Sequence, residues 1–191
     1  MNVVLETAVA VQNFCLRQGW EFCFIGGVAC QKWSEPRVTD DVDLTLITGF
    51  GTDGPYIDAL LAWLQPRRPD AKDFAERHRV LLLKTESGVG IDIAMGAFPF
   101  EQLATQRACD IELAPGVKLR LCTAEDFIVF KTFAARALDW RDVEMTIVRQ
   151  GDAALDWSYI RTQLIPLLEL KEQPGLLDEL EALRAKLKRH R

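Results

Sequence analysis

The pattern of apolar and polar positions predicts alternating helices and short strands, followed by a purely helical half. Helical spacing of apolar residues predicts helices over 3–18, 28–34, 56–64, 98–109, 123–138, 139–150, 156–170 and 175 to the end. Short apolar or alternating runs predict strands over 21–25, 42–48, 79–84 and 90–95, and a strand pair over 111–121. Segment 74–78 is ambiguous. The order of elements predicts an α/β (α+β) fold with a mixed sheet flanked by helices and a C-terminal helical bundle, with a boundary near residue 122.

The strand predicted over 42–48 begins beside two aspartates that share one face. Side chains two residues apart in a strand point the same way, so Asp41 and Asp43 project together, opposite to Val42 and Leu44. Adjacent carboxylates repel each other unless a proton or a cation lies between them, and Mg²⁺ prefers such oxygen ligands. The pattern therefore predicts either a divalent-metal site or a polar strand start with solvated aspartates.

Two further features accompany this acidic strand. The apolar run Phe22–Ile25 ends in the Gly26-Gly27 turn, and the helix predicted over 28–34 presents its first backbone amides there, which suits a phosphate. Asp92 lies in the middle of a later predicted strand, between small residues on its own face. If it is buried, its carboxylate needs a partner.

The composition predicts a globular chain without a broad nucleic-acid surface. Of the 191 residues, 49% are hydrophobic and 27% are charged, which allows a substantial core. The net charge of −5 and the pI of about 5.2 exclude a globally basic surface. Local basic patches remain at 67–68, 77–79 and 186–191.

The cysteine and histidine contents bear on the redox state of the thiols and on the presence of a zinc site. Five cysteines without a Cys-x-x-Cys motif indicate reduced, mostly buried thiols, and two histidines argue against a histidine-based zinc site. No apolar segment approaches the roughly 18–20 residues of a membrane span, and the N-terminus lacks a signal pattern. We therefore expect a cytoplasmic protein without a membrane partner.

A second group of ionisable residues lies in the helical half. Lys131 follows Phe127 by four residues, so it lies on or beside the apolar stripe of the helix predicted over 123–138, where it can also extend to water. Asp139 and Asp142 lie one helical turn apart. Taken alone, they are equally typical of an exposed, ion-paired helix junction.

Taken together, these motifs resemble the nucleotidyltransferases of the DNA polymerase β superfold. More closely, they resemble the AbiEii/AbiGii-type toxin branch and its uncharacterised relatives, over about residues 20–145. The resemblance depends on separate pieces in a fixed order. These are Gly26-Gly27, Arg37-x-Thr39-x-Asp41-x-Asp43, Asp92, the run from Phe127 to Ala134 with Lys131, and Arg136-x-Leu138-Asp139-x-x-Asp142.

The resemblance implies a fold and an activity. It implies a nucleotidyltransferase-like α/β domain over 1–122 and a helical region over 123–191 packed on it. The expected enzyme transfers a nucleoside monophosphate from a nucleoside triphosphate such as ATP to an acceptor hydroxyl on an RNA end, a protein or a small molecule. The resemblance also implies Mg²⁺, with two ions expected, and a partner protein in a toxin–antitoxin pair.

The resemblance further implies roles for individual residues. Asp41, Asp43 and Asp92 would bind the metal and act in catalysis, with Asp92 as the carboxylate that activates the nucleophile. Lys131 would also act in catalysis by pairing with triphosphate oxygens. Asp139 would support the site together with Asp142, for instance by orienting the lysine. The implied nucleotide-binding positions are Gly26, Gly27, Arg37, Thr39 and Lys131.

Two positions depart from the family pattern, and two alternatives stay open. Gly27 stands where the superfold usually has a serine, so backbone amides must replace a hydroxyl, and Leu138 stands where a basic residue is expected. Arg37 either touches phosphate or braces Asp41. One alternative is a non-catalytic nucleotide-binding protein, or a toxin–antitoxin partner, with a degenerate site. The other is a structural α/β protein whose acidic residues lie more than about 10 Å apart.

Overall fold

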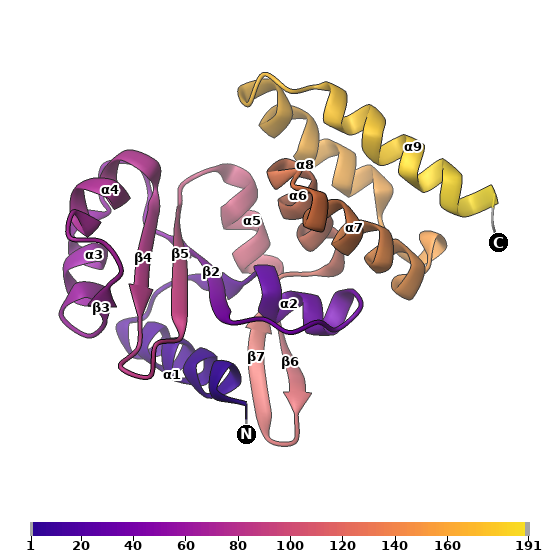
Figure 1. Cartoon of the computed structure of the whole chain (residues 1–191). Coiled ribbons are helices and arrows are strands. Elements are labelled where there is room, and N and C mark those ends of the chain that lie inside the picture. The colour runs from indigo at the N-terminus through magenta and orange to yellow at the C-terminus, as the bar shows by residue number, and fades with distance from the viewer. Residues whose placement is uncertain (1, 190–191) are drawn as a thin grey trace. The chain divides into compact units, whose positions relative to one another are not determined.

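The computed structural model describes residues 2–189 and divides into two compact units (Figure 1). The first unit comprises the residues up to Val28 together with Val38–Cys122. The second comprises Ala29–Arg37 and the chain from Thr123 onward. Residues 190 and 191, the end of the last predicted helix and of its basic patch, lie outside the described residues.

All the strands that the structure describes within residues 2–189 belong to the first unit. They are β1 (Phe22–Phe24), β2 (Asp41–Ile47), β3 (Gln65–Pro66), β4 (Val80–Lys84), β5 (Gly90–Gly96), β6 (Cys109–Ala114) and β7 (Val117–Leu121). The helices of this unit are α1 (Val3–Gln18), α3 (Gly54–Leu61), α4 (Ala71–His78) and α5 (Pro99–Arg107). Helix α2 (Gly26–Trp33) begins in the first unit and ends in the second.

The strands form a single mixed sheet in the order β3-β4-β5-β2-β1-β7-β6. Strand β2 runs parallel to β5 on one side and antiparallel to β1 on the other. Strand β1 in turn runs parallel to β7, and β6 and β7 form a hairpin. The mixed sheet flanked by helices confirms the fold class predicted from the sequence.

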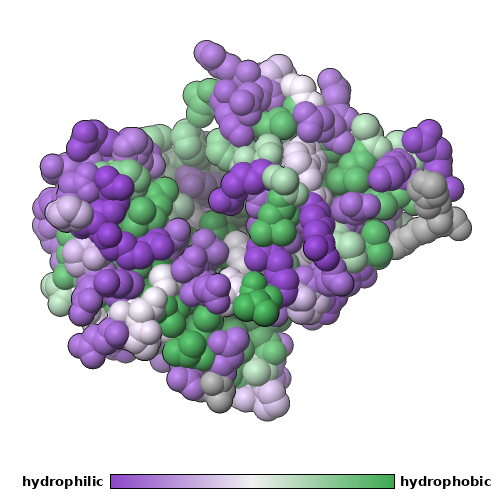
Figure 2. All heavy atoms as spheres, viewed as in Figure 1, coloured by the Kyte–Doolittle hydropathy of each residue, from purple (hydrophilic) through white to green (hydrophobic). Residues whose placement is uncertain are grey.

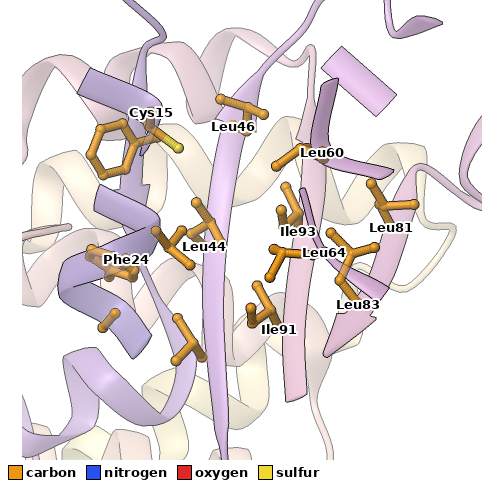
Figure 3. Packing of buried hydrophobic residues seen from close by; sticks show 14 of the residues in the cluster. Cys15, Phe24, Leu44, Leu46, Leu60, Leu64, Leu81, Leu83, Ile91 and Ile93 are labelled. Carbon is orange, nitrogen blue, oxygen red and sulfur yellow. The ribbon is translucent and has the colours of Figure 1, made fainter. Parts of the chain in front are cut away.

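The alternation of residues along β2 and β5 gives the sheet one apolar face. Leu44 and Ile93 are fully buried register partners, and Figure 3 shows them facing the same core as Cys15 of α1 and Leu60 of α3. Truncating such a side chain to alanine typically costs about 2–5 kcal/mol. Because one face is so strongly buried, the register of these strands is well specified, and the intervening residues must lie on the opposite face.

The second unit is helical. Its remaining helices are α6 (Ala124–Ala134), α7 (Ala137–Gln150), α8 (Trp157–Leu170) and α9 (Gly175–Arg189), with a short 3₁₀ turn at Asp152–Ala154. Helix α6 packs against α7, α8 and α9 through buried residues such as Phe127 and Ile128. This arrangement agrees with the helical pattern read beyond residue 122.

Several element boundaries differ from the prediction. The end predicted for the helix over 123–138 was wrong. Helix α6 stops at Ala134, because Ala135 adopts a left-handed conformation with φ of 56°. The edge strand β3 was missed, and the ambiguous segment 74–78 belongs to α4. Helix α2 begins two residues earlier than predicted, at Gly26 itself.

Hydrophilic residues cover most of the molecular face shown in Figure 2, with hydrophobic residues scattered among them. This distribution agrees with a charged content of 27%. Among the described residues, no helix is both long enough and apolar enough to cross a membrane.

Candidate functional site

Three carboxylates share the face of the sheet opposite the core. In the parallel register of β2 and β5, Asp43 is the partner of Asp92, and Asp41 is the partner of Gly90. Register partners in neighbouring strands lie ~4.8 Å apart, and diagonal neighbours lie ~7–8 Å apart. The Cα atoms of all three aspartates are therefore close together, and each residue is partly exposed. This spacing does not fit the alternative that required widely separated acidic residues.

Glycines make room for two of these carboxylates. A Cβ atom on Gly90 would lie 2.0 Å from Oδ1 of Asp41, which no real side chain tolerates. A Cβ atom on Gly26 would lie 2.1 Å from Oδ2 of Asp43, and Gly26 also has a φ of +52°, in the left-handed region that favours glycine. The carboxylates thus lie directly against bare backbone, which restricts where their oxygens can point.

Gly27 stands at a position where the structure leaves no room for a side chain. A Cβ atom at this position would lie 2.1 Å from Oγ1 of Thr39, so Thr39 occupies the space that a serine side chain needs. The hydroxyl of Thr39 donates to the backbone carbonyl of Asp41 at 3.2 Å. The N–H of Gly27 donates to Oδ2 of Asp43 at 3.1 Å, so this amide binds a carboxylate in the present conformation.

Arg67 is a neighbour of the carboxylates that the sequence did not reveal as a site residue. Its Nη2 atom donates to Oδ1 of Asp92, and the two side chains are 30% and 34% exposed. The sequence showed this arginine only as part of a local basic patch. The two-residue strand β3, which places it beside the sheet, has no recognisable sequence signal.

The donor chemistry of this face fits a divalent cation such as Mg²⁺. Carboxylates on adjacent strands offer the hard oxygen ligands that this ion prefers, and the glycines beneath them leave room for the carboxylate oxygens. Within residues 2–189, however, no group of three His, Cys, Asp or Glu side chains is arranged closely enough to hold a metal. The assignment of Asp41, Asp43 and Asp92 as metal ligands therefore stays a prediction.

The second unit contains a separate buried charge network centred on Lys131. The Nζ atom of Lys131 lies 2.8 Å from Oδ1 of Asp139 and 2.8 Å from Oδ2 of Asp142. The lysine side chain is 8% exposed, and both aspartates are 3% exposed. Its ammonium group is thus bound by two buried carboxylates rather than extended into water. A contact between Lys131 and a triphosphate stays a prediction.

Arg37 and Arg136 complete this network. Arg37 binds Asp142 through two hydrogen bonds of 3.3 and 3.2 Å, which raise the pKa of the guanidinium, so its partner is Asp142 rather than Asp41. Arg136 donates to Oδ2 of Asp139 at 2.7 Å. Burial opposes ionisation of Asp139, but the hydrogen bonds from Lys131 and Arg136 outweigh it and lower the pKa of Asp139.

The predicted site residues therefore form two groups. The carboxylate group lies in the first unit and the lysine group in the second. The carboxylate group comprises Gly26, Gly27, Thr39, Asp41, Asp43 and Asp92. The lysine group comprises Arg37, Lys131, Asp139 and Asp142. Leu138, where the family pattern has a basic residue, is 47% exposed.

Comparison with known proteins gives matches among solved structures alone. No protein-family model matches the sequence, and no curated protein matches it. The fold resembles the crystal structure of an antigenic nucleotidyltransferase-like protein from Paracoccidioides brasiliensis, with 17% identity and a TM-score of 0.52. That match covers 95% of this chain and 94% of the other.

Two structures of the antibiotic-resistance factor ANT(2'')-Ia are also similar. The solution structure has 15% identity and a TM-score of 0.53, covering 98% of this chain and 95% of the other. The crystal structure with adenylyl-2''-tobramycin has 14% identity and a TM-score of 0.53, covering 88% of this chain and 95% of the other. At these identities the likeness shows the fold, which is nucleotidyltransferase-like.

Proposed function

We propose that this chain is a metal-dependent nucleotidyltransferase that moves a nucleoside monophosphate from a nucleoside triphosphate to an acceptor hydroxyl. The observation that carries the proposal is the register of β2 and β5, which puts Asp41, Asp43 and Asp92 on one partly exposed face beside Gly26 and Gly27 at the start of α2. The nucleotidyltransferase-like fold of the whole chain supports it.

In the proposed reaction, the oxygen of the acceptor hydroxyl attacks the α-phosphorus of the triphosphate. The new P–O bond forms as the bond to pyrophosphate breaks, and pyrophosphate leaves with the electron pair. Asp92, on the accessible face, receives the hydroxyl proton. Asp41, Asp43 and Asp92 would hold the divalent ion, which when bound would neutralise charge on the transferred group and lower the pKa of the attacking hydroxyl.

The chemistry of this surface favours a small acceptor over a long nucleic acid. The net charge of −5 provides no broad basic surface for phosphate contacts. A fold neighbour was solved with adenylyl-2''-tobramycin, a nucleotidylated small molecule. Hydroxyl-bearing small molecules, aminoglycosides among them, are therefore the first acceptors to test. The AbiEii-type branch, a toxin–antitoxin role and a cytoplasmic location stay predictions.

The test is transfer of label from each of four α-³²P-labelled triphosphates, with Mg²⁺ or Mn²⁺, to aminoglycosides, total RNA or a protein extract. We expect one labelled acceptor class with the wild-type protein and a loss of at least about 100-fold with Asp43→Asn. The matched control is Asp40→Asn, because Asp40 is an exposed neighbour of the same charge. Full transfer by Asp43→Asn refutes the assignment.

A non-catalytic nucleotide-binding protein is the second candidate. It is supported by the ion pair between Arg67 and Asp92, because a cation of the protein itself already binds one of the carboxylates. This candidate predicts a thermal shift with triphosphate and Mg²⁺ but no labelled product from any acceptor. Label transfer that depends on Asp43 rules it out.

A further inference from the structure

Arg67 reaches the carboxylate face from the edge of the sheet. Its N–H donates to the carbonyl of Leu82 at 3.0 Å, which continues the pairing of β3 with β4. Leu82 is also the register partner of Asp92 in the pairing of β4 with β5. The side chain of Arg67 therefore crosses one strand, on the face opposite the core, to contact Asp92 on the next.

The guanidinium lies above Gly90, between two of the three aspartates. One nitrogen, Nη2, donates to Asp92. The other, Nη1, lies 3.3 Å from the point where a Cβ of Gly90 would be, and Oδ1 of Asp41 lies 2.0 Å from that same point. A single cationic side chain thus lies among the carboxylates that would have to bind a metal ion.

We propose that Arg67 is an internal counter-cation of the carboxylate group that competes with the divalent ion and must leave when the ion binds. The proposal builds on the proposed function, because it concerns the same carboxylates. The guanidinium binds Asp92 directly, so its side chain has to move away before an ion can take its place. A divalent ion among the same oxygens would repel it strongly at such short range.

The same arginine also stabilises the carboxylate group when no metal is bound. Three carboxylates on one face repel each other, and the guanidinium offsets part of that repulsion. Removing Arg67 therefore has opposite effects in the two states. The metal-free protein becomes less stable at low ionic strength, while the affinity for the divalent ion rises.

The adjacent Arg68 offers a matched control. It binds Asp70 through hydrogen bonds of 2.9 and 3.1 Å, and its guanidinium lies 4.2 Å from the ring centroid of Phe74. Changing Arg68 alters the net charge by the same amount without touching the carboxylate group. It therefore separates a local effect from a general change in protein charge.

The test is direct binding of Mn²⁺, without nucleotide, measured by the EPR signal of the unbound ion. We expect Arg67→Gln to bind Mn²⁺ about tenfold more tightly than wild type, within the usual range of coupling between two sites. Arg67→Lys, which keeps the charge, stays within about threefold of wild type, and Arg68→Gln equals it. In EDTA and low salt, Arg67→Gln melts at a lower temperature than wild type, and Mn²⁺ raises its melting temperature by a larger interval.

Unchanged or weaker Mn²⁺ binding by Arg67→Gln overturns the proposal, and so does an absence of binding to both proteins. The outcomes are separable from those of the transfer assay. If the wild type transfers label and Arg67→Gln binds Mn²⁺ with unchanged affinity, the proposed enzymatic function stands and the proposed role of Arg67 is refuted. Tighter Mn²⁺ binding without any transfer supports the role of Arg67 and refutes the enzyme.

Discussion

Asp43 on β2 and Asp92 on β5 are direct register partners across a parallel strand pair. Without a metal, their charges repel, so neutralising one should relieve strain rather than create it. We expect Asp43→Asn to unfold at the same temperature as wild type or higher in EDTA, because the amide oxygen still accepts the hydrogen bond from Gly27. Differential scanning calorimetry measures this. A clear fall in melting temperature would show that the carboxylate has a structural partner instead.

Position 90 must be a glycine because the side chain of Asp41 occupies the space beside it, not because the strand itself needs a glycine. In Gly90→Ala, the new methyl group occupies the position of Oδ1 of Asp41, so that side chain must rotate away. We expect Mn²⁺ binding and nucleotide transfer to fall about tenfold or more, while the free energy of unfolding changes by about 1 kcal/mol or less. Urea denaturation and Mn²⁺ titration test the two parts separately.

The control for this variant is Gly54→Ala, since nothing lies within 4 Å of a Cβ there. Gly54→Ala should bind Mn²⁺ like wild type. If Gly90→Ala binds Mn²⁺ as well as the control, Asp41 is not a metal ligand.

Lys131 stabilises the second unit through two buried carboxylates. Lys131→Met preserves most of the side-chain volume but leaves Asp139 and Asp142 buried near each other without their shared cation. Breaking a buried pair typically costs about 3–5 kcal/mol when the remaining charge has no other partner. Because Arg136 still binds Asp139 and Arg37 still binds Asp142, we expect a smaller loss of about 1–3 kcal/mol. Urea unfolding should show a loss of this size, whereas Lys186→Met, at an exposed position of α9, should leave the midpoint unchanged. Equal midpoints for both variants would show that the network contributes little.

The lowered pKa of Asp139 gives the protein a defined acid sensitivity. Its ordinary value is 3.8, and the folded value is lower, so as the pH falls the unfolded chain takes up this proton first. The stability contributed by Asp139 is therefore complete at neutral pH and is lost as the pH falls from about 4 through the folded pKa. The difference in unfolding free energy between wild type and Asp139→Asn should be constant from pH 6 to about pH 5 and shrink below about pH 4. A difference that grows on acidification would contradict the sign.

Thiol accessibility tests the expectation of reduced, mostly buried cysteines. Cys109 is exposed, whereas Cys15, Cys23, Cys30 and Cys122 are buried. Burial raises the pKa of Cys15 to about 12, so this thiol stays protonated and unreactive at pH 8. Ellman's reagent should modify one thiol per native chain quickly and the rest after unfolding, and Cys109→Ser should remove the fast phase. A second fast thiol would show that a buried segment opens readily.

The sequence predicted elements best where one period was strong and uninterrupted. The alternation Val42, Leu44, Leu46 marks β2, and it also places Asp41 and Asp43 together on the other face. The parallel pairing of Asp43 with Asp92 could not be derived, because a local pattern carries no information about which distant strand lies alongside. The resemblance to a known superfold supplied that expectation.

Predictions from the sequence failed where the conformation or contacts of a residue depend on tertiary structure rather than on its type. Ala135 ends α6 in a left-handed conformation, with its N–H donating to the carbonyl of Lys131, although alanine is the best helix former. Lys131 can extend to water by its position on the helix, but two buried aspartates bind it instead. Arg67 depends on a two-residue strand, which is too short for any periodicity to show.

The two margins of the sheet are unequal, and this has a consequence for self-association. Strand β3 is very short, exposed and ends in Pro66, which has no N–H to offer an incoming chain. Strand β6, at the opposite margin, has exposed acidic side chains at Asp110 and Glu112. A strand of a neighbouring molecule would therefore lack a hydrogen-bond donor at β3 and would face negative charge at β6. Concentrated solutions of the folded chain should accordingly resist the strand-by-strand accretion that leads to fibrils.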